Sequence, residues 1–194
     1  MGIPQKKQRN IGGNLAMKQE ESSYTIADIE ALPEDVRAEL IDGKIYMMAT
    51  PTATHQRILG FLHYEFRSYI RDHQGTCEVF FAPFAVYLNE LNQYVEPDLV
   101  VTCDDRKVDE KGCHGGPDLA VEIVSESSRS KDYLIKQAKY QEYGVREYWI
   151  VDPDKKCVRV YDYEHDEVQD YTFLEPVPVG IYGKNLKIDF SEFL

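Results

Sequence analysis

The sequence predicts an α/β fold built on a mixed sheet, with α+β character in its strand-rich C-terminal part. Two segments place apolar side chains three or four residues apart, the spacing of a helix that packs on one side. Strand-like segments come before, between and after them. This mixed order favours an α/β or α+β sandwich over a doubly wound nucleotide-binding sheet. A chain of 194 residues is expected to form one domain, which we place at 23–194.

The N-terminal part predicts a leader, a short helix and a hairpin. Residues 1–22 are polar, glycine-bearing and aperiodic, so we predict a disordered leader. The stretch 25–35 is typical of a short amphipathic helix. Two apolar-rich runs follow within 37–48, joined by Asp42 and Gly43. An Asp-Gly pair in this position is a strong hairpin signal, because both turn residues need a positive φ.

The first long helix is predicted between Thr54 and Asp72, with Thr54 as its cap and Gly75 just after its end. Its apolar stripe is formed by Ile58, Leu62, Phe66 and Tyr69. Strands are predicted after it at 77–88, 94–103 and 117–125. The last of these is apolar almost throughout, as expected of a central strand that is buried on both faces.

A second helix is predicted between Lys131 and Tyr143, capped by Ser128 or Ser130 and ended by Gly144. A buried strand follows at 145–152. The rest of the chain predicts antiparallel strands at 157–164, 168–174 and 185–190.

The charge balance limits the classes of function. The chain has 22 basic and 34 acidic residues, a formal net charge of −12. A protein that holds a polyanion usually carries a basic face, because phosphate neutralisation supplies most of the sequence-independent affinity. The acidic net charge therefore counts against tight, indiscriminate DNA binding. A chain with this net charge can still contain a local basic groove. The candidates for that groove, each otherwise a solvated surface charge, are Arg57, Arg67, Arg71, Arg129 and Lys131.

The cysteines and the apolar runs bear on location. Cys77, Cys103, Cys113 and Cys157 form no CxxC pair, and we predict reduced thiols. His114 follows Cys113, but no second ligand pair accompanies them, so a zinc site is not expected. No apolar run approaches the roughly 20 residues of a membrane span, and no apolar signal region follows the basic N-terminal residues. These features predict a cytoplasmic protein without a membrane partner.

Two carboxylates interrupt strands that are otherwise apolar. Asp98 lies in VEPDLVV and Glu122 in LAVEIVS. A carboxylate in a buried strand is unfavourable unless it is paired or bound to a cation. One interpretation is a divalent metal that relieves the repulsion between them. The other is that Glu122 pairs with an arginine or caps a helix, while Asp98 bends the strand beside Pro97.

The second predicted helix offers a basic partner. Asp132, Lys136 and Tyr140 are spaced four apart and therefore share one helical face. A strand–loop–helix connection of this length allows Lys136 to fold back towards the end of the Glu122 strand. The alternative is that Asp132 and Lys136 form a solvated pair on the surface.

The strings PDLVV, GGPDLAVEIVSESS and KQAKYQEYGVREYWIVDP, together with ELIDGKIYMMATPTATHQRI before them, resemble a known family. It is the large bacterial family of putative restriction endonucleases, long catalogued as a domain of unknown function, within the PD-(D/E)XK nuclease superfamily. The resemblance covers roughly residues 25–192. It implies a restriction-endonuclease-like core of helix, three strands, helix and strand. An N-terminal hairpin and an antiparallel C-terminal extension would flank this core.

The resemblance also implies site residues. Asp98 matches the aspartate of the PD half-motif, and Glu122 matches the acidic residue of the (D/E)XK half-motif. Val124 stands where the family pattern has lysine, so Lys136 is the candidate for a lysine relocated to the helix. Two further residues, Glu39 in AELIDG and His55 at the start of the first long helix, match recurring positions and would complete the site.

The implied chemistry is metal-dependent hydrolysis of phosphodiester bonds in nucleic acid, which we expect to be DNA. Asp98, Glu122 and the backbone carbonyl of Ile123 would ligate Mg²⁺ or Mn²⁺, because hard oxygen ligands suit hard cations. Lys136 would orient the attacking water or neutralise the scissile phosphate. We expect a homodimer, since two-fold dimers are the commonest assemblies and suit the cutting of two strands.

Two other functions stay open. The same fold with an inactive site could serve as a module for binding or assembly, which Val124 and the acidic composition favour. A metal-dependent hydrolase acting on a phosphorylated small molecule is the other, and it would need no basic groove.

Overall fold

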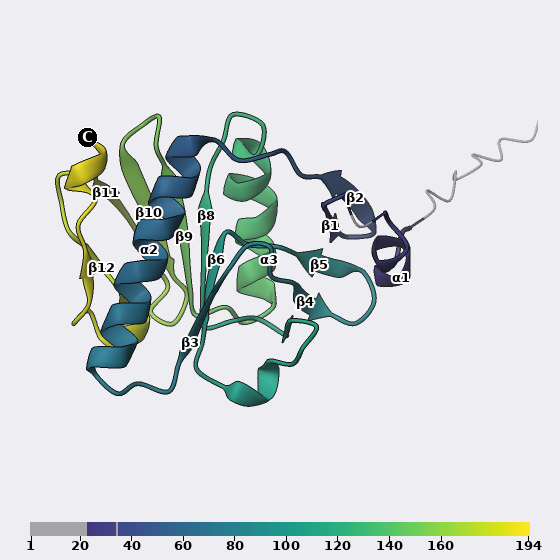
Figure 1. Ribbon diagram of the computed structural model, residues 1–194, viewed down its shortest axis with the longest axis horizontal. Helices are drawn as coiled ribbons and strands as arrows, with labels where there is room; N and C mark the ends of the chain where they lie inside the picture. The colour runs from purple at the N-terminus through teal and green to yellow at the C-terminus, as the bar shows by residue number, and fades with distance from the viewer. Residues whose placement is uncertain (1–22, 34) are drawn as a thin grey trace, which may run out of the picture.

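The computed structural model describes residues 23–33 and 35–194, and its largest element is a six-stranded sheet (Figure 1). The strand order is β11-β10-β9-β8-β6-β3. β8 and β9 run parallel, whereas the other neighbouring strands of this sheet are antiparallel. The bounds are β3 Glu78–Phe81, β6 Leu99–Thr102, β8 Leu119–Ile123, β9 Glu147–Asp152, β10 Cys157–Asp162 and β11 Glu167–Thr172. The leader predicted at 1–22 lies outside the described residues.

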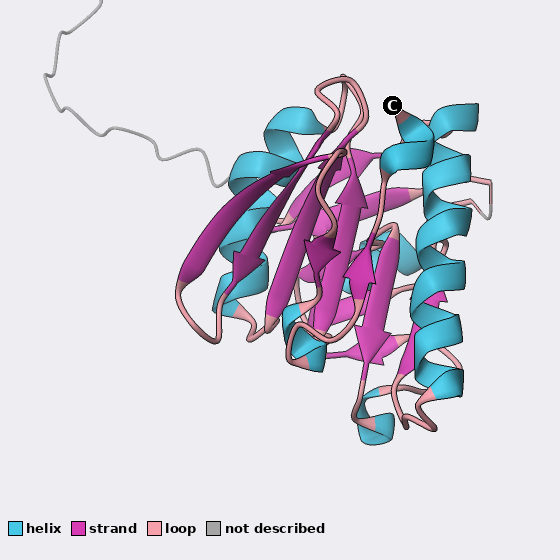
Figure 2. Ribbon diagram, turned by 90° about the vertical axis from the view of Figure 1, so that its left-hand side faces the viewer, coloured by secondary structure: helices cyan, strands magenta, loops and turns pink. Residues whose placement is uncertain are grey.

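Helices lie on both faces of this sheet (Figure 2). α2 (Ala53–Asp72) covers one face. The other face carries a π-helical segment, η2 (Lys131–Lys136), which continues as α3 (Gln137–Glu142). The mixed fold and its predicted core of helix, three strands, helix and strand are confirmed, in the order α2, β3, β6, β8, η2 with α3, and β9.

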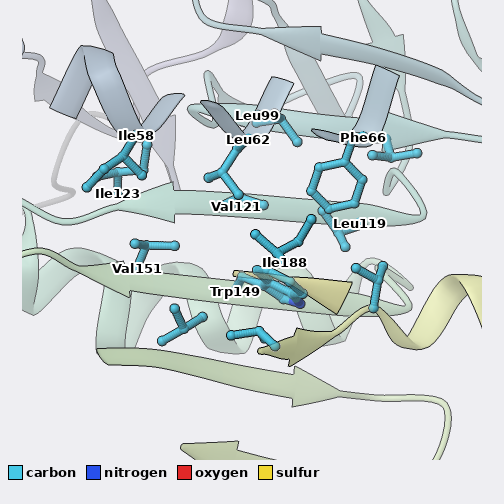
Figure 3. Packing of buried hydrophobic residues seen from close by; sticks show 14 of the residues in the cluster. Ile58, Leu62, Phe66, Leu99, Leu119, Val121, Ile123, Trp149, Val151 and Ile188 are labelled. Atoms are coloured by element: carbon cyan, nitrogen blue, oxygen red, sulfur yellow. The ribbon is translucent and has the colours of Figure 1, made fainter. Parts of the chain in front are cut away.

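The layer between α2 and the sheet forms the larger core (Figure 3). Ile58, Leu62 and Phe66 lie on one stripe of α2, as their spacing predicts, and all three are fully buried. They pack against β8 and β9, where Phe66 meets Trp149 edge-on with 6.1 Å between the ring centroids. Burying an apolar side chain of this size stabilises a fold by about 1.5–3 kcal/mol. This layer therefore fixes α2, and with it the first turn of α2, relative to the sheet.

A five-stranded sheet with the order β2-β1-β5-β4-β7 packs on the α3 side. Its bounds are β1 Ala38–Ile41, β2 Lys44–Met47, β4 Val86–Asn89, β5 Gln93–Val95 and β7 Cys113–His114. Ile41 and Val95 of this sheet share a buried cluster with Tyr140 of α3. The predicted hairpin is confirmed: Asp42 and Gly43 have φ of 51° and 71° and join β1 to β2.

Short elements complete the described chain. Helix α1 (Ile26–Glu30) occupies part of the predicted 25–35 segment and ends before Pro33. The remaining elements are β12 Val177–Pro178, paired with β13 Lys187–Ile188, and the 3₁₀ helices η1 Asp105–Lys107, η3 Gly180–Tyr182 and η4 Ser191–Phe193. Within residues 23–33 and 35–194, no helix combines the length and the apolar character needed to cross a membrane.

Two predicted strands are each divided between the two sheets. The 77–88 segment forms β3 and β4 with Pro83 between them, and the 94–103 segment forms β5 and β6 with Pro97 between them. Proline has no N–H to donate to a sheet, so a strand ends readily beside it. The second division matters for function, because Asp98 follows Pro97 at the point where the chain enters the six-stranded sheet.

The helix ends differ in detail from the prediction. Thr52, rather than Thr54, caps α2, and its hydroxyl accepts a hydrogen bond from the backbone N–H of His55. Gln74, rather than Gly75, has the left-handed backbone after the helix, with φ of 51°. Ser130 precedes η2 but its side chain makes no capping bond. Several polar residues crowd both helix starts, so the sequence does not single out the one that caps.

The prediction of four reduced thiols is wrong for one pair. Cys77 and Cys103 form a disulfide. They flank the antiparallel strands β3 and β6, in which Glu78 pairs with Thr102, so the register sets the two cysteines opposite each other. Their separation of 26 residues carries no sequence signal of this pairing. The disulfide also removes the cysteine argument for a reducing compartment.

Candidate active site

Asp98 sits at the start of β6 and is held from two sides. One carboxylate oxygen, Oδ2, accepts a hydrogen bond from the backbone N–H of Ile123 at 2.7 Å. The other, Oδ1, lies 3.0 Å from Nε2 of His55 in the first turn of α2. Both side chains keep 14% of their surface exposed. The Asp98 carboxylate is therefore fixed in orientation and still reachable from solvent.

Glu122 lies beside Asp98 in the sheet. β6 and β8 are antiparallel with Leu99 opposite Val121, so the register places Asp98 opposite Glu122. Directly opposed residues project from the same side of a sheet. That side faces α3, because Val124, two residues beyond Glu122, belongs to the cluster that packs on α3. The two predicted carboxylates are thus neighbours on one face.

The Glu122 carboxylate accepts side-chain hydrogen bonds at one of its two oxygens. Its Oε1 accepts hydrogen bonds from Nζ of Lys136 at 2.6 Å and from the hydroxyl of Tyr140 at 2.8 Å. No described residue donates a hydrogen bond to its other oxygen, Oε2. One oxygen of this buried carboxylate is therefore free to accept a further partner.

Glu39 completes the site from the other sheet. It belongs to β1 and is fully buried. Its Oε1 lies 2.6 Å from Nζ of Lys136, and its Oε2 lies 2.5 Å from Nζ of Lys131. The buried ammonium of Lys136 therefore bridges Glu39 and Glu122, and joins the two sheets.

The π-helical segment explains how both lysines reach Glu39. Lys131 and Lys136 are five residues apart, and in an α-helix of 3.6 residues per turn they would point about 140° away from each other. A π-helix hydrogen-bonds from residue i to i+5, which brings residues five apart nearly above one another. The segment Lys131–Lys136 has this geometry. Its wider turn therefore directs both ammonium groups to one carboxylate.

The charges of the cluster shift the pKa values of its members. Burial raises the pKa of Glu122 well above its ordinary value, and the charges of Asp132, Asp98 and Glu39 add to the rise against the effect of Lys136. Burial acts to lower the pKa of Lys136, but Glu122, Glu39 and Asp132 raise it well above its ordinary value. The surrounding carboxylates therefore favour the charged form of Lys136 inside the fold.

Glu39 shifts in the opposite direction to Glu122. Its burial acts to raise its pKa, but Lys136 and Lys131 more than offset this, and the pKa falls. Two carboxylates at similar depth thus differ because one faces two lysines and the other faces one.

The structure brings together all five side chains that the sequence assigns to the site, namely Asp98, Glu122, Lys136, Glu39 and His55. Ile123 joins them through its backbone N–H, and ligation of a metal by its carbonyl stays a prediction.

Two further residues, Tyr140 and Asp132, belong to the site although their sequence pattern assigns them no role in it. The spacing of Tyr140 from Lys136 gives its helical face but not its bond to Glu122. The spacing of Asp132 from Lys136 fits a surface pair equally well. Asp132 is in fact buried, and its Oδ1 lies 3.9 Å from Nζ of Lys136.

The basic residues proposed for a groove fall into two groups. Lys131 is paired with Glu39, and Arg129 forms ion pairs with Asp152 and Asp154. Arg57, Arg67 and Arg71 are exposed on α2. Only the second group is available to a ligand.

The cluster has features that suit a divalent cation. Four carboxylates (Glu39, Asp98, Glu122, Asp132) surround two lysines, so the site carries an excess of negative charge when all are ionised. Oδ1 of Asp132 and Nδ1 of His55 are buried without a hydrogen-bond partner in the described chain. No three Asp, Glu, His or Cys side chains converge into a ready-made cage among residues 23–33 and 35–194. Two carboxylates and water suit Mg²⁺, which usually keeps several waters.

Comparison with known proteins adds to this geometry. The model of a family described as "Putative restriction endonuclease" (Uma2) matches residues 26–181. A search of curated proteins gave no match. Among solved structures, the chain is similar to the crystal structure of "a putative nuclease belonging to DUF820" from Anabaena variabilis. The TM-score is 0.73 with 23% sequence identity, covering 88% of this chain and 99% of that one. At this identity the similarity shows a shared fold.

Proposed function

Since the chain belongs to the family described as putative restriction endonucleases, we propose that it is a metal-dependent nuclease that hydrolyses phosphodiester bonds in nucleic acid. The observation that carries the proposal is the pairing of Asp98 and Glu122 on one face of the sheet, with Lys136 at 2.6 Å from Glu122. We take DNA as the substrate, as the family description suggests.

Each residue of the cluster has a task in this mechanism. Asp98, the free oxygen of Glu122 and the carbonyl of Ile123 would hold Mg²⁺ or Mn²⁺. Such a cation, when bound, lowers the pKa of a coordinated water and offsets negative charge on the phosphate. His55 and the N–H of Ile123 orient Asp98, as hydrogen-bond partners of metal ligands commonly do.

Lys136 and Tyr140 act on the other side of the cluster. Lys136 supplies a fixed positive charge beside Glu122, where it stabilises negative charge that develops on the phosphate in the transition state. Tyr140 holds Oε1 of Glu122 and leaves Oε2 available. Glu39 holds the ammonium of Lys136 from the second sheet.

Cleavage assays with the purified chain test the proposal. We expect nicking or cleavage of plasmid and of single-stranded DNA with Mg²⁺ or Mn²⁺, and none with EDTA. Asp98→Asn and Glu122→Gln should each abolish it. Glu147→Gln is a matched control, because Glu147 is an equally buried glutamate in neighbouring β9 that is bound by Trp149 and Ile181 instead. Activity that survives both site variants would come from a contaminant or another site, and would refute the assignment.

A module without catalysis is the second candidate. The specific observation in its favour is that Lys136 already forms ion pairs with both Glu39 and Glu122 within the fold. The two candidates differ in metal binding. Isothermal titration with Mn²⁺ should give binding that Asp98→Asn removes if the site is catalytic, and no binding if the cluster is a closed ion-pair network.

We also expect a homodimer, on the general frequency of two-fold assemblies. Light scattering coupled to size-exclusion chromatography measures this directly. A monomer at every concentration would exclude a dimer that cuts both strands together.

A further inference from the structure

The solvent face of α2 carries an unusual set of side chains. Along the helix, exposed residues recur three or four apart, which makes them one continuous stripe. They are Arg57, Gly60, Tyr64, Arg67 and Arg71. We call Arg57, Tyr64, Arg67 and Arg71 the arginine stripe.

The arginine stripe is positive within a chain whose net charge is −12. It contains no carboxylate, since Glu65 is half-buried and lies one residue off the stripe. Arg57 and Arg67 form no ion pair with any residue in the described ranges. Arg71 pairs with Asp72, but their side chains are 67% and 59% exposed, and so open a pair contributes little and separates readily. All three guanidinium groups are therefore available to an anion.

Aromatic surface accompanies these charges. Tyr64 stands within the stripe and keeps 64% of its surface exposed. Phe81, at the end of edge strand β3, is 50% exposed, and its ring meets the ring of His63 on α2 edge-on, with 4.7 Å between centroids. His63 lies one turn before Arg67. Two open aromatic rings thus lie on or next to the stripe.

The stripe begins near the candidate active site. Arg57 is two residues after His55, whose ring contacts Asp98. Phe81 is opposite Leu99 in the sheet, and Leu99 follows Asp98. From Arg57 to Arg71 the helix rises about 21 Å at 1.5 Å per residue. Leu99 faces α2 and Asp98 faces α3, so the stripe and the carboxylates lie on opposite faces of the sheet and are connected through the first turn of α2, where His55 contacts Asp98.

We propose that the arginine stripe binds single-stranded nucleic acid, with phosphates on Arg57, Arg67 and Arg71 and unpaired bases stacked on Tyr64 and Phe81. Arginine recognises phosphate through its planar fork of donors. Aromatic rings beside a positive track are typical of surfaces that bind single strands, because the face of a base is open only when it is unpaired and unstacked. The choice of nucleic acid as the ligand rests on the proposed function. The exposed aromatic rings limit that ligand to single strands or to the unpaired ends of a duplex.

Binding measured without cleavage tests this proposal. Fluorescence anisotropy in EDTA compares a labelled oligothymidylate with a duplex of the same length over a range of salt concentrations. The variant R57Q/R67Q/R71Q should weaken single-strand binding more than tenfold at low salt. It should also reduce the slope of log K against log salt by about two, because each phosphate that an arginine neutralises on a single strand accounts for roughly 0.7 of that slope.

The control variant also removes three positive charges, but from arginines outside the arginine stripe. R106Q/R146Q/R159Q deletes three arginines that pair with carboxylates outside α2 and should leave the slope unchanged. Tyr64→Ser should weaken single-strand binding by about fivefold or more and leave duplex binding unchanged. Circular dichroism verifies that each variant is folded.

The outcomes separate this proposal from the nuclease proposal. Asp98→Asn should lose cleavage and keep binding. If the wild type does not cleave but R57Q/R67Q/R71Q still loses binding, the nuclease proposal fails and the arginine stripe stands. If the triple variant binds like the wild type, or Tyr64→Ser weakens duplex binding equally, the stripe proposal is overturned.

Discussion

Nζ of Lys136 lies 2.6 Å from Oε1 of Glu122, although 14 positions separate the two residues in the chain. Val124, the position at which the family resemblance expects a lysine, is buried in an apolar cluster on the same side of β8. The ammonium therefore reaches the carboxylate from the helix instead of from the strand. This contact is confirmed, while the part of Lys136 in catalysis stays a prediction.

Replacing Lys136 should destabilise the fold. Lys136→Met leaves Glu39, Glu122 and Asp132 buried without its charge, and removing one partner of a buried ion pair typically costs about 3–5 kcal/mol. Urea unfolding near neutral pH measures the loss. Lys139→Met is the control, because Lys139 lies in the same helix and pairs with exposed Asp42 and Glu142, where the loss should stay below about 1 kcal/mol. Equal losses in both variants would contradict the described cluster.

Divalent cations should stabilise the folded chain. A ligand that binds only the native state at 100 times its Kd contributes about 2.7 kcal/mol, and the excess of carboxylates at the site predicts such binding. Melting followed by circular dichroism should therefore give a higher Tm with Mn²⁺ than with EDTA. The gain should disappear in Asp98→Asn and persist in Glu147→Gln. A gain of the same size in Asp98→Asn would place the cation elsewhere.

Loss of the disulfide should lower stability without removing the active-site geometry. Cys77 and Cys103 are 26 residues apart, and closing a loop of that size stabilises the native state by about 3.5 kcal/mol in the chain-entropy description. Unfolding of C77S/C103S should show a loss of this order, and wild-type protein under strong reductant should match it. Identical unfolding curves with and without reductant would show that the bond contributes nothing.

His114 should give a stability difference that depends on pH. The hydrogen bond with Glu90 raises the pKa of His114 above its ordinary 6.5, and Asp109 adds to the rise. Burial acts in the opposite direction but does not cancel it. A raised pKa in the folded state means that the stabilisation is complete below 6.5 and is lost as the pH rises through the folded value.

The measurement compares unfolding free energies of the wild type and His114→Gln at mildly acidic and mildly alkaline pH. The free energy of unfolding of the wild type should exceed that of the variant at acidic pH. The difference should stay below about 1 kcal/mol, because the partners of His114 are exposed. An advantage that grows on the alkaline side would reverse the assigned direction.

The strands that carry the acids were predictable because their composition is extreme. A carboxylate between valines and isoleucines, as at Glu122, marks both a buried strand and a polar task within it. Glu39 and His55 came from the family resemblance, since neither position carries a strong local signal. Register then brought the pieces together: the pairing of Leu99 with Val121 is what sets Asp98 opposite Glu122.

Other features depended on partners remote in sequence. Each of the two predicted strands is divided at its proline, Pro83 or Pro97, because its two halves pair with strands of different sheets. The alternation of apolar and polar residues within a segment does not indicate which strand it pairs with. The disulfide depends on the same register. The burial of Asp132 follows from the packing of η2 between the sheets, whereas its spacing from Lys136 equally fits a solvated pair.

The widened turn at Lys131–Lys136 makes the ion cluster depend on the backbone geometry of this helix. If this turn tightened into an ordinary α-helix of the same length, Lys131 and Lys136 would point about 140° away from each other around the axis. Lys131 would then swing away from Glu39, even though no residue that contacts Glu39 had been replaced. The ion cluster therefore depends on the backbone hydrogen-bond pattern of this helix as well as on the side chains that contact Glu39.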